Sequence, residues 1–183
     1  KILLASILIN FLITYFLNSY SLLSNFIIIS ALFLVISSLM DFNKSFKKNE
    51  INSSRIISHV AFGFLILFIG LNHNFSLEKD FNLKLGEKRK FDNYSIEFKD
   101  LKLKDFENYK AVIGEFQINN LKKNFIQFLY PEIRIYDNPK TITYEASIKS
   151  SFLKDYYITM SNVDRSDCYN IKFQKKPFMM WIW

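Results

Sequence analysis

Residues Ile2 to Met40 form a stretch without a single charged side chain. All 17 acidic residues, and all but one of the 24 basic residues, lie after this stretch. A helix needs about 20 apolar residues to cross a bilayer core of roughly 30 Å. The stretch therefore predicts two membrane helices, over about residues 2–17 and 22–40, joined as an antiparallel hairpin by the polar segment 18–21. A signal peptide fits poorly, because the apolar region is too long and lacks an Ala-x-Ala end.

A third apolar run, Ile56–Leu71, lies between Arg55 and Asn72 and predicts another membrane helix over about residues 55–72. The loop before it carries a group of basic residues: Lys44, Lys47, Lys48 and Arg55, against Asp41 and Glu50. Short loops rich in Lys and Arg stay on the cytoplasmic side. We therefore expect a multi-pass protein of the bacterial inner membrane, with everything after Asn72 in the periplasm, or the equivalent in the mitochondrial inner membrane.

Residues 74–176 show a different pattern, in which apolar and polar residues alternate. Tyr94, Ile96 and Phe98 occupy every second position, and Leu101 and Leu103 continue on the opposite parity. This period, interrupted by Asn, Asp, Gly and Pro, predicts a small all-β domain, a barrel or sandwich of six to eight strands. Ser147–Leu153 is interpreted as a helical turn. The aromatic run 177–183 is interpreted as the start of a further membrane helix, because Trp is typical of the membrane interface.

Several functional classes find little support. The chain has no histidine after His73, so the β domain offers no Ser-His or Cys-His pair. Its single cysteine, Cys168, excludes an internal disulfide, a CxxC pair and a Cys-rich zinc site. The net charge of +7 comes mostly from lysines, and no RNP or helix-turn-helix signature accompanies it. We therefore expect no nucleic-acid partner.

His59 is the most informative single residue. A histidine inside a membrane helix is costly unless it has a partner, which would be either a neighbouring helix or a haem iron. Arg55, one turn earlier on the same face, could contact a haem propionate. Gly63 could leave room for a flat macrocycle, or Gly63 and Gly70 could merely allow close helix packing. His73 lies about 21 Å further along the helix axis and cannot share an iron with His59, so it is interpreted as an interfacial polar residue.

Four segments, in their order along the chain, resemble motifs of the CcmF family, the membrane component of the cytochrome c haem lyase. They are Ser58-His59-Val60-Ala61-Phe62-Gly63, Pro131–Tyr136 with Thr143–Ile148, Leu153–Tyr157, and Lys176–Trp183. The resemblance is clearest from Arg55 to Trp183. Three positions depart from the family pattern, since Met180 replaces an arginine, Tyr144 a threonine and Ser147 an alanine.

The resemblance implies that His59 is an axial ligand of a membrane-bound b-type haem (haem b), with the second axial ligand outside this chain. It also implies attachment of haem to the CxxCH thiols of apocytochrome c, with a haem chaperone, other cytochrome c maturation subunits and the lipid bilayer as partners. The chain by itself contains no complete active site and no catalytic residue.

Two alternatives come from other functional classes. The first is a non-enzymatic, membrane-anchored β module for protein docking or complex assembly, in which His59 only packs. The second is a transporter segment, which is disfavoured because the first acidic residue, Asp41, lies at a helix boundary and not inside the membrane region.

Overall fold

The computed structural model describes residues 1–17, 21–47, 53–122, 125–162 and 167–183. The chain forms two compact units, each considered by itself below. The helical unit comprises Lys1–Ser76, Phe152–Lys154 and Lys176–Trp183, and the β unit comprises Leu77–Ser151 and Asp155–Lys175. Most of the predicted hairpin turn (residues 18–20), together with Lys48 and Glu50 of the basic loop, lies outside the described residues.

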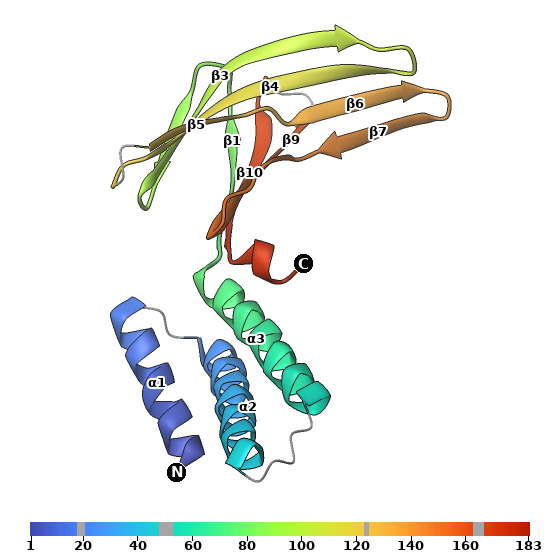
Figure 1. Ribbon diagram of the computed structural model, residues 1–183. Coiled ribbons are helices and arrows are strands. Elements are labelled where there is room, and N and C mark those ends of the chain that lie inside the picture. The colour runs from blue at the N-terminus through green and yellow to red at the C-terminus, as the bar shows by residue number, and fades with distance from the viewer. Residues whose placement is uncertain (18–20, 48–52, 123–124, 163–166) are drawn as a thin grey trace. The chain divides into compact units, whose positions relative to one another are not determined.

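The helical unit contains α1 (Ile2–Leu17), α2 (Leu22–Lys47) and α3 (Ser53–Phe75), with α2 between the other two in Figure 1. The helices α2 and α3 are long and apolar enough to cross a membrane, and α1 is a shorter apolar helix. Helix α2 continues past Met40, where the uncharged stretch ends. Lys44 and Lys47 fall in its last turn, where cations interact favourably with the helix dipole.

Small residues dominate the contacts between these helices. The buried residues of α2 recur every three or four positions: Ser24, Ile28, Ala31, Val35 and Ser38. The buried residues of α3 are Ile56, Gly63 and Gly70, spaced by seven, so they form one stripe along the helix. In a membrane, such stripes let helix backbones approach closely and pack by van der Waals contact.

The last residues fold back onto α3 within the helical unit. Met179–Trp181 form the 3₁₀ turn η1, whose Trp181 ring stacks on Phe68 at a centroid distance of 5.4 Å. The Trp181 indole N–H donates to the Phe152 carbonyl at 3.0 Å, and the Asn72 amide donates to the Pro177 carbonyl at 2.5 Å. The aromatic segment 177–183 thus packs against the C-terminal end of α3.

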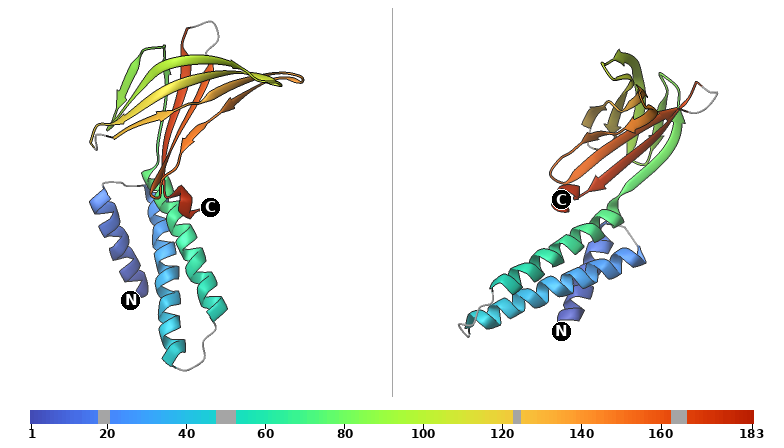
Figure 2. Two further views of the ribbon diagram at one scale, coloured as in Figure 1. Left: turned by 45° about the horizontal axis from the view of Figure 1, so that its top comes forward. Right: turned by 90° about the vertical axis from the view of Figure 1, so that its right-hand side faces the viewer.

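The β unit is a sandwich built from ten described strands, more than the six to eight expected. They are β1 (Leu77–Leu83), β2 (Lys88–Phe91), β3 (Tyr94–Asp105), β4 (Tyr109–Asn120), β5 (Phe125–Leu129), β6 (Glu132–Asp137), β7 (Lys140–Glu145), β8 (Ser147–Lys149), β9 (Lys154–Asn162) and β10 (Tyr169–Pro177). One sheet has the order β1-β10-β9-β8 and the other β2-β3-β4-β6-β7, with β5 also paired to β4. Figure 2 shows the two sheets from two further directions.

Alternate residues of both sheets form the core of the β unit. Fully buried members include Ile96, Phe98 and Phe116 from one sheet and Ile158 and Phe173 from the other. The Phe98 and Phe116 rings stack at a centroid distance of 4.5 Å. Because both sheets contribute to one core, the sequence prediction of an all-β domain is confirmed, and the sandwich is the correct form of it.

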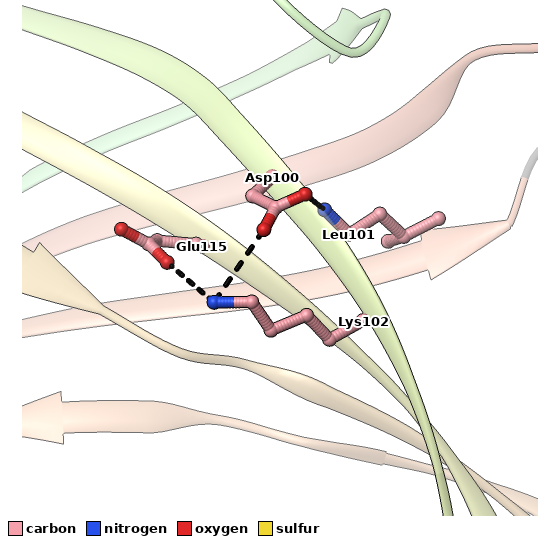
Figure 3. A network of polar contacts seen from close by, with 4 residues as sticks. All are labelled: Asp100, Leu101, Lys102 and Glu115. Carbon is pink, nitrogen blue, oxygen red and sulfur yellow. Dashed lines mark hydrogen bonds and ion pairs between the residues drawn. The ribbon is translucent and has the colours of Figure 1, made fainter.

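A β-bulge explains the change of parity within β3. The pairing with β4 runs regularly to Phe98↔Phe116 and resumes at Asp100↔Glu115, so Lys99 has no opposite residue. Asp100 Oδ1 accepts a hydrogen bond from the Leu101 N–H at 2.8 Å. Lys102 Nζ lies 3.4 Å from Asp100 Oδ2 and 3.2 Å from Glu115 Oε2. Figure 3 shows both contacts, and these hydrogen bonds, that with Glu115 foremost, raise the pKa of Lys102. Lys102 is exposed to solvent, so these ion pairs contribute little to the stability of the bulge.

The predicted helical turn over Ser147–Leu153 is wrong. Ser147–Lys149 form β8, an edge strand that pairs with β9 through Ser147↔Ile158 and Lys149↔Tyr156. Three residues are too few to show an alternation in the sequence, so pairing with the next strand determines the conformation here.

Candidate functional site

His59 lies in the second turn of α3, beside the buried stripe and not on it. The residues of the stripe on either side, Ile56 and Gly63, face α2, whereas His59 is exposed. The His59 side chain makes no hydrogen bond with the described parts of α1, α2 and α3. The choice between a neighbouring helix and a haem iron as the partner of His59 therefore stays a prediction.

Gly63 is used for helix packing. A Cβ atom added at Gly63 would lie 2.6 Å from Val35 Cγ2 and 3.4 Å from the Val35 backbone nitrogen. At Gly70 an added Cβ would lie 3.0 Å from side-chain atoms of both Ile27 and Ile28. Helix α2 fills the space beside Gly63. The geometry therefore favours close helix packing as the role of these glycines over room for a haem macrocycle.

A haem placed at His59 would rest on the other flank of α3. Arg55, His59, Phe62, Ile66 and Ile69 follow spacings of four and three, so they share one side of the helix. Phe62 and Ile69 are exposed, and Ile66 is half-buried. This donor set fits a haem in type, because it offers one imidazole for iron, apolar side chains for the macrocycle and a guanidinium for a propionate.

His73 is engaged in a different contact. Its Nδ1 atom lies 2.8 Å from the Ser24 hydroxyl, which is buried at the start of α2. His59 and His73 lie on one continuous helix, so their separation along its axis, about 21 Å, keeps them from meeting on one metal. His73 thus links the adjoining ends of α2 and α3.

Two apolar cavities lie on the flank of α3 away from His59. One, of about 380 Å³, is lined by Leu39, Phe42, Ser53, Ile56, Ile57, Val60 and Ala61. The second, of about 370 Å³, is lined by Ala61, Phe64, Leu65, Phe68 and Trp181. Neither cavity includes a side chain that can ligate a metal, so their size does not identify them as the haem site.

The β unit presents no catalytic arrangement among its described residues, and no group of three His, Cys, Asp or Glu side chains is placed to hold a metal there. Its most buried acid, Asp155, accepts a hydrogen bond from the Ser151 N–H at 3.3 Å and another from the Tyr157 hydroxyl at 3.4 Å. Both contacts hold the chain at the start of β9, so the role of Asp155 is structural.

Tyr157 is expected to make the β unit sensitive to alkaline pH. Burial, and then the neighbouring Asp155 carboxylate, raise the pKa of Tyr157 above its ordinary value of 10. The unfolded chain therefore loses this proton first, and stability falls as pH rises from about 10 through the folded-state pKa. Denaturant midpoints measured between pH 9 and 11 should fall less steeply in Tyr157→Phe than in the wild type. An equally shallow slope in the exposed control Tyr144→Phe would contradict this assignment.

Comparison with known proteins decides the family. The family model described as CcmF C-terminal beta-sandwich matches residues 74–177, more than half of the chain. The chain belongs to the CcmF family. The cytochrome c-type biogenesis protein CcmF of Escherichia coli K12 is 24% identical over 128 residues, and that of Haemophilus influenzae 26% over 129 residues. Each alignment covers 70% of this chain and 20% of the relative, so the chain matches about a fifth of the length of these CcmF proteins.

The likeness extends to the fold. A solved structure titled cytochrome c heme lyase CcmF superposes with a TM-score of 0.69 at 16% sequence identity, covering 99% of this chain and 31% of that one. The combination of membrane helices followed by a small all-β domain is therefore the fold of a CcmF C-terminal fragment. The motif Ser58–Gly63 lies on α3, Pro131–Tyr136 includes all of β6 but Asp137, and Thr143–Ile148 runs from β7 into β8.

Proposed function

We propose that this chain is the C-terminal part of a membrane subunit that matures cytochromes c. The observation that carries the proposal is the family match over residues 74–177, supported by relatives named cytochrome c-type biogenesis protein. The similarity of the whole chain to a structure titled cytochrome c heme lyase agrees with it. In this role the chain would help attach haem to the CxxCH thiols of apocytochrome c, with a haem chaperone and other maturation subunits as partners.

Within this function, His59 would be one axial ligand of a b-type haem, and Arg55 would contact a propionate. A haem held by two imidazoles has no open position for substrate and supplies electron transfer. His59 would contribute a nitrogen lone pair to the iron, and the exposed side chain of Phe62 would exclude water from the macrocycle. The second axial ligand would come from a helix outside this chain.

The proposed location is the bacterial inner membrane, or the mitochondrial equivalent, with the β unit on the outer side. Lys44 and Lys47 at the end of α2 and Arg55 at the start of α3 belong to one short loop region. Such a concentration of cations favours the cytoplasmic side. Helix α3 would then run from the cytoplasmic to the outer side of the membrane.

The test is an optical spectrum of the intact parent protein, purified from membranes and reduced with dithionite. We expect a b-type spectrum in the wild type, its loss in His59→Ala, and its partial return in His59→Gly when free imidazole is added. Cytochrome c maturation should fail in the alanine variant. His73→Ala is the matched control, because it changes a histidine of the same helix that is already hydrogen-bonded to Ser24.

The alternative function, a non-enzymatic membrane-anchored β module, makes the opposite prediction at His59. A reduced spectrum and a maturation yield that are the same in His59→Ala and the wild type would overturn the haem-ligand role. The chain would then act through docking by its β unit, which presents no catalytic arrangement among its described residues.

A further inference from the structure

The edge strands of the sandwich differ in how they discourage pairing with another strand. An edge strand exposes backbone N–H and C=O groups that a further strand can pair, and charged residues or a short length normally prevent this. Strand β2 carries the exposed Lys88, Arg89 and Lys90 in succession. Strand β1 carries Glu78, Lys79 and Asp80, and β8 has only three residues.

Strand β7 lacks such protection along its middle. Between Lys140 and Glu145 its four residues Thr141–Tyr144 are uncharged, and all are β-branched or aromatic, types that favour strands. Ile142 is 57% exposed and Tyr144 50% exposed. In the described part of the sheet, β6 is the strand hydrogen-bonded to β7, so the opposite edge of β7 is open.

The exposed apolar side chains of β7 extend the core face of the sheet beyond the buried residue Ile133. Ile142 lies opposite Ile135, and Tyr144 lies opposite Ile133, so all four occupy one face of the sheet. On β4 this same face carries Val112. A cavity of about 390 Å³ lies at the beginning of β7, lined by Ile135, Tyr136, Asp137, Lys140, Thr141 and Ile142. A strand added beside β7 would find apolar contacts for every second side chain.

The acidic side chains at the end of β7 favour a partner strand that carries a basic residue. Glu145 lies directly opposite Glu132, and like charges in this position are destabilising. The Arg134 guanidinium donates a hydrogen bond to Glu132 at 2.9 Å. Its positive charge therefore balances Glu132 on β6. Glu145 receives a hydroxyl hydrogen bond from Thr143 at 3.1 Å. A basic side chain on the outer side of Glu145 would balance this pair of acids.

We propose that the open edge of β7 binds an extended polypeptide segment of a protein partner as an additional strand. The strand runs antiparallel, as β6 does to β7, and places a basic residue opposite Glu145. Apolar residues then lie opposite Tyr144 and Ile142, which gives the order basic-apolar-polar-apolar along the partner. Backbone pairing supplies affinity and the alternate side chains supply specificity. This inference does not depend on haem or on His59.

The probe is a blocked synthetic peptide containing Lys-Val-Thr-Val, labelled with a fluorophore and titrated against the full chain in detergent. A second peptide carries Glu in place of Lys. We expect the wild type to prefer the Lys peptide about three- to fivefold, the effect of one cross-strand charge pair. Glu145→Lys should reverse the preference, and Ile142→Lys should weaken both peptides at least tenfold.

The control is Arg89→Glu on the edge strand β2, which should leave both affinities unchanged. All three positions are exposed or at an edge, and an unchanged thermal transition shows that each variant is folded. The proposal is overturned if neither peptide binds at millimolar concentration, or if Glu145→Lys keeps the wild-type preference. It is also overturned if the chain forms a dimer that Ile142→Lys dissolves while the peptides fail to bind, because the occupant is then a second copy.

Discussion

Phe116→Ala is expected to lower the free energy of unfolding of the β unit by about 4 kcal/mol, within the range for a buried Phe cut to Ala. Phe116 is fully buried and stacks on Phe98, with ring planes 15° apart. Its removal leaves a cavity between the two sheets, which the rigid strands cannot collapse to fill. Urea unfolding of the detergent-solubilised chain, followed by the β-sheet circular dichroism signal, measures the change.

Phe128→Ala is the matched control for this experiment. Phe128 belongs to β5 on the same sheet, but its side chain is 44% exposed. We expect a loss of about 0.5 kcal/mol or less, as for an ordinary surface substitution. Equal losses in the two variants would mean that the stacked pair is not part of a tightly packed core.

Gly63→Val is expected to destabilise the pairing of α2 with α3 by about 2–3 kcal/mol, the usual effect of overpacking. The Cβ atom of the new side chain would already lie 2.6 Å from Val35 Cγ2. The Val35 backbone nitrogen, 3.4 Å from the same Cβ atom, limits how far the two helices can adjust. Thermal stability of the helices in detergent, with disulfide cross-linking between cysteines introduced on α2 and α3, measures the separation.

Exchanging the two residues provides the control for this prediction. In the double variant Gly63→Val with Val35→Gly, the large side chain sits on α3 and the space for it on α2. A double-mutant cycle should then show recovery of most of the lost stability. If the single variant is as stable as the wild type, or if the exchange restores nothing, the close contact at Gly63 does not hold these helices together.

The sequence predicted the architecture where a period is long enough to be recognised. The uncharged stretch to Met40 and the alternation through Tyr94, Ile96 and Phe98 correctly indicated a membrane helix region followed by an all-β domain. The end of α2 at Lys47 was missed, because hydropathy marks the apolar part of a helix whereas hydrogen bonding continues into charged residues. Strand β8 was missed because its three residues are too few to show a period, and its conformation depends on pairing with the next strand, β9.

The candidate site was predictable only in its residue types. His59 was recognisable because a histidine is unusual in an apolar helix. Arg55 was recognisable because it lies one helical turn from His59. The role of Gly63 could not be decided from sequence, since room for a ligand and room for a helix require the same small residue. The chain's own partner for that space, Val35, became apparent only when α2 was placed beside α3. The haem-ligand role of His59 stays a prediction until the spectrum is measured.

The bulge in β3 also governs which changes in chain length this domain can absorb during evolution. Lys99 is the extra residue between Phe98 and Asp100, and its side chain is exposed. A homologue lacking this one residue would keep Phe98 and Leu101 on the core face, because the alternation then becomes regular. Loss of a residue elsewhere in the strand would turn lysines and aspartates inward. Among the positions of β3, gaps in related sequences should therefore gather at Lys99.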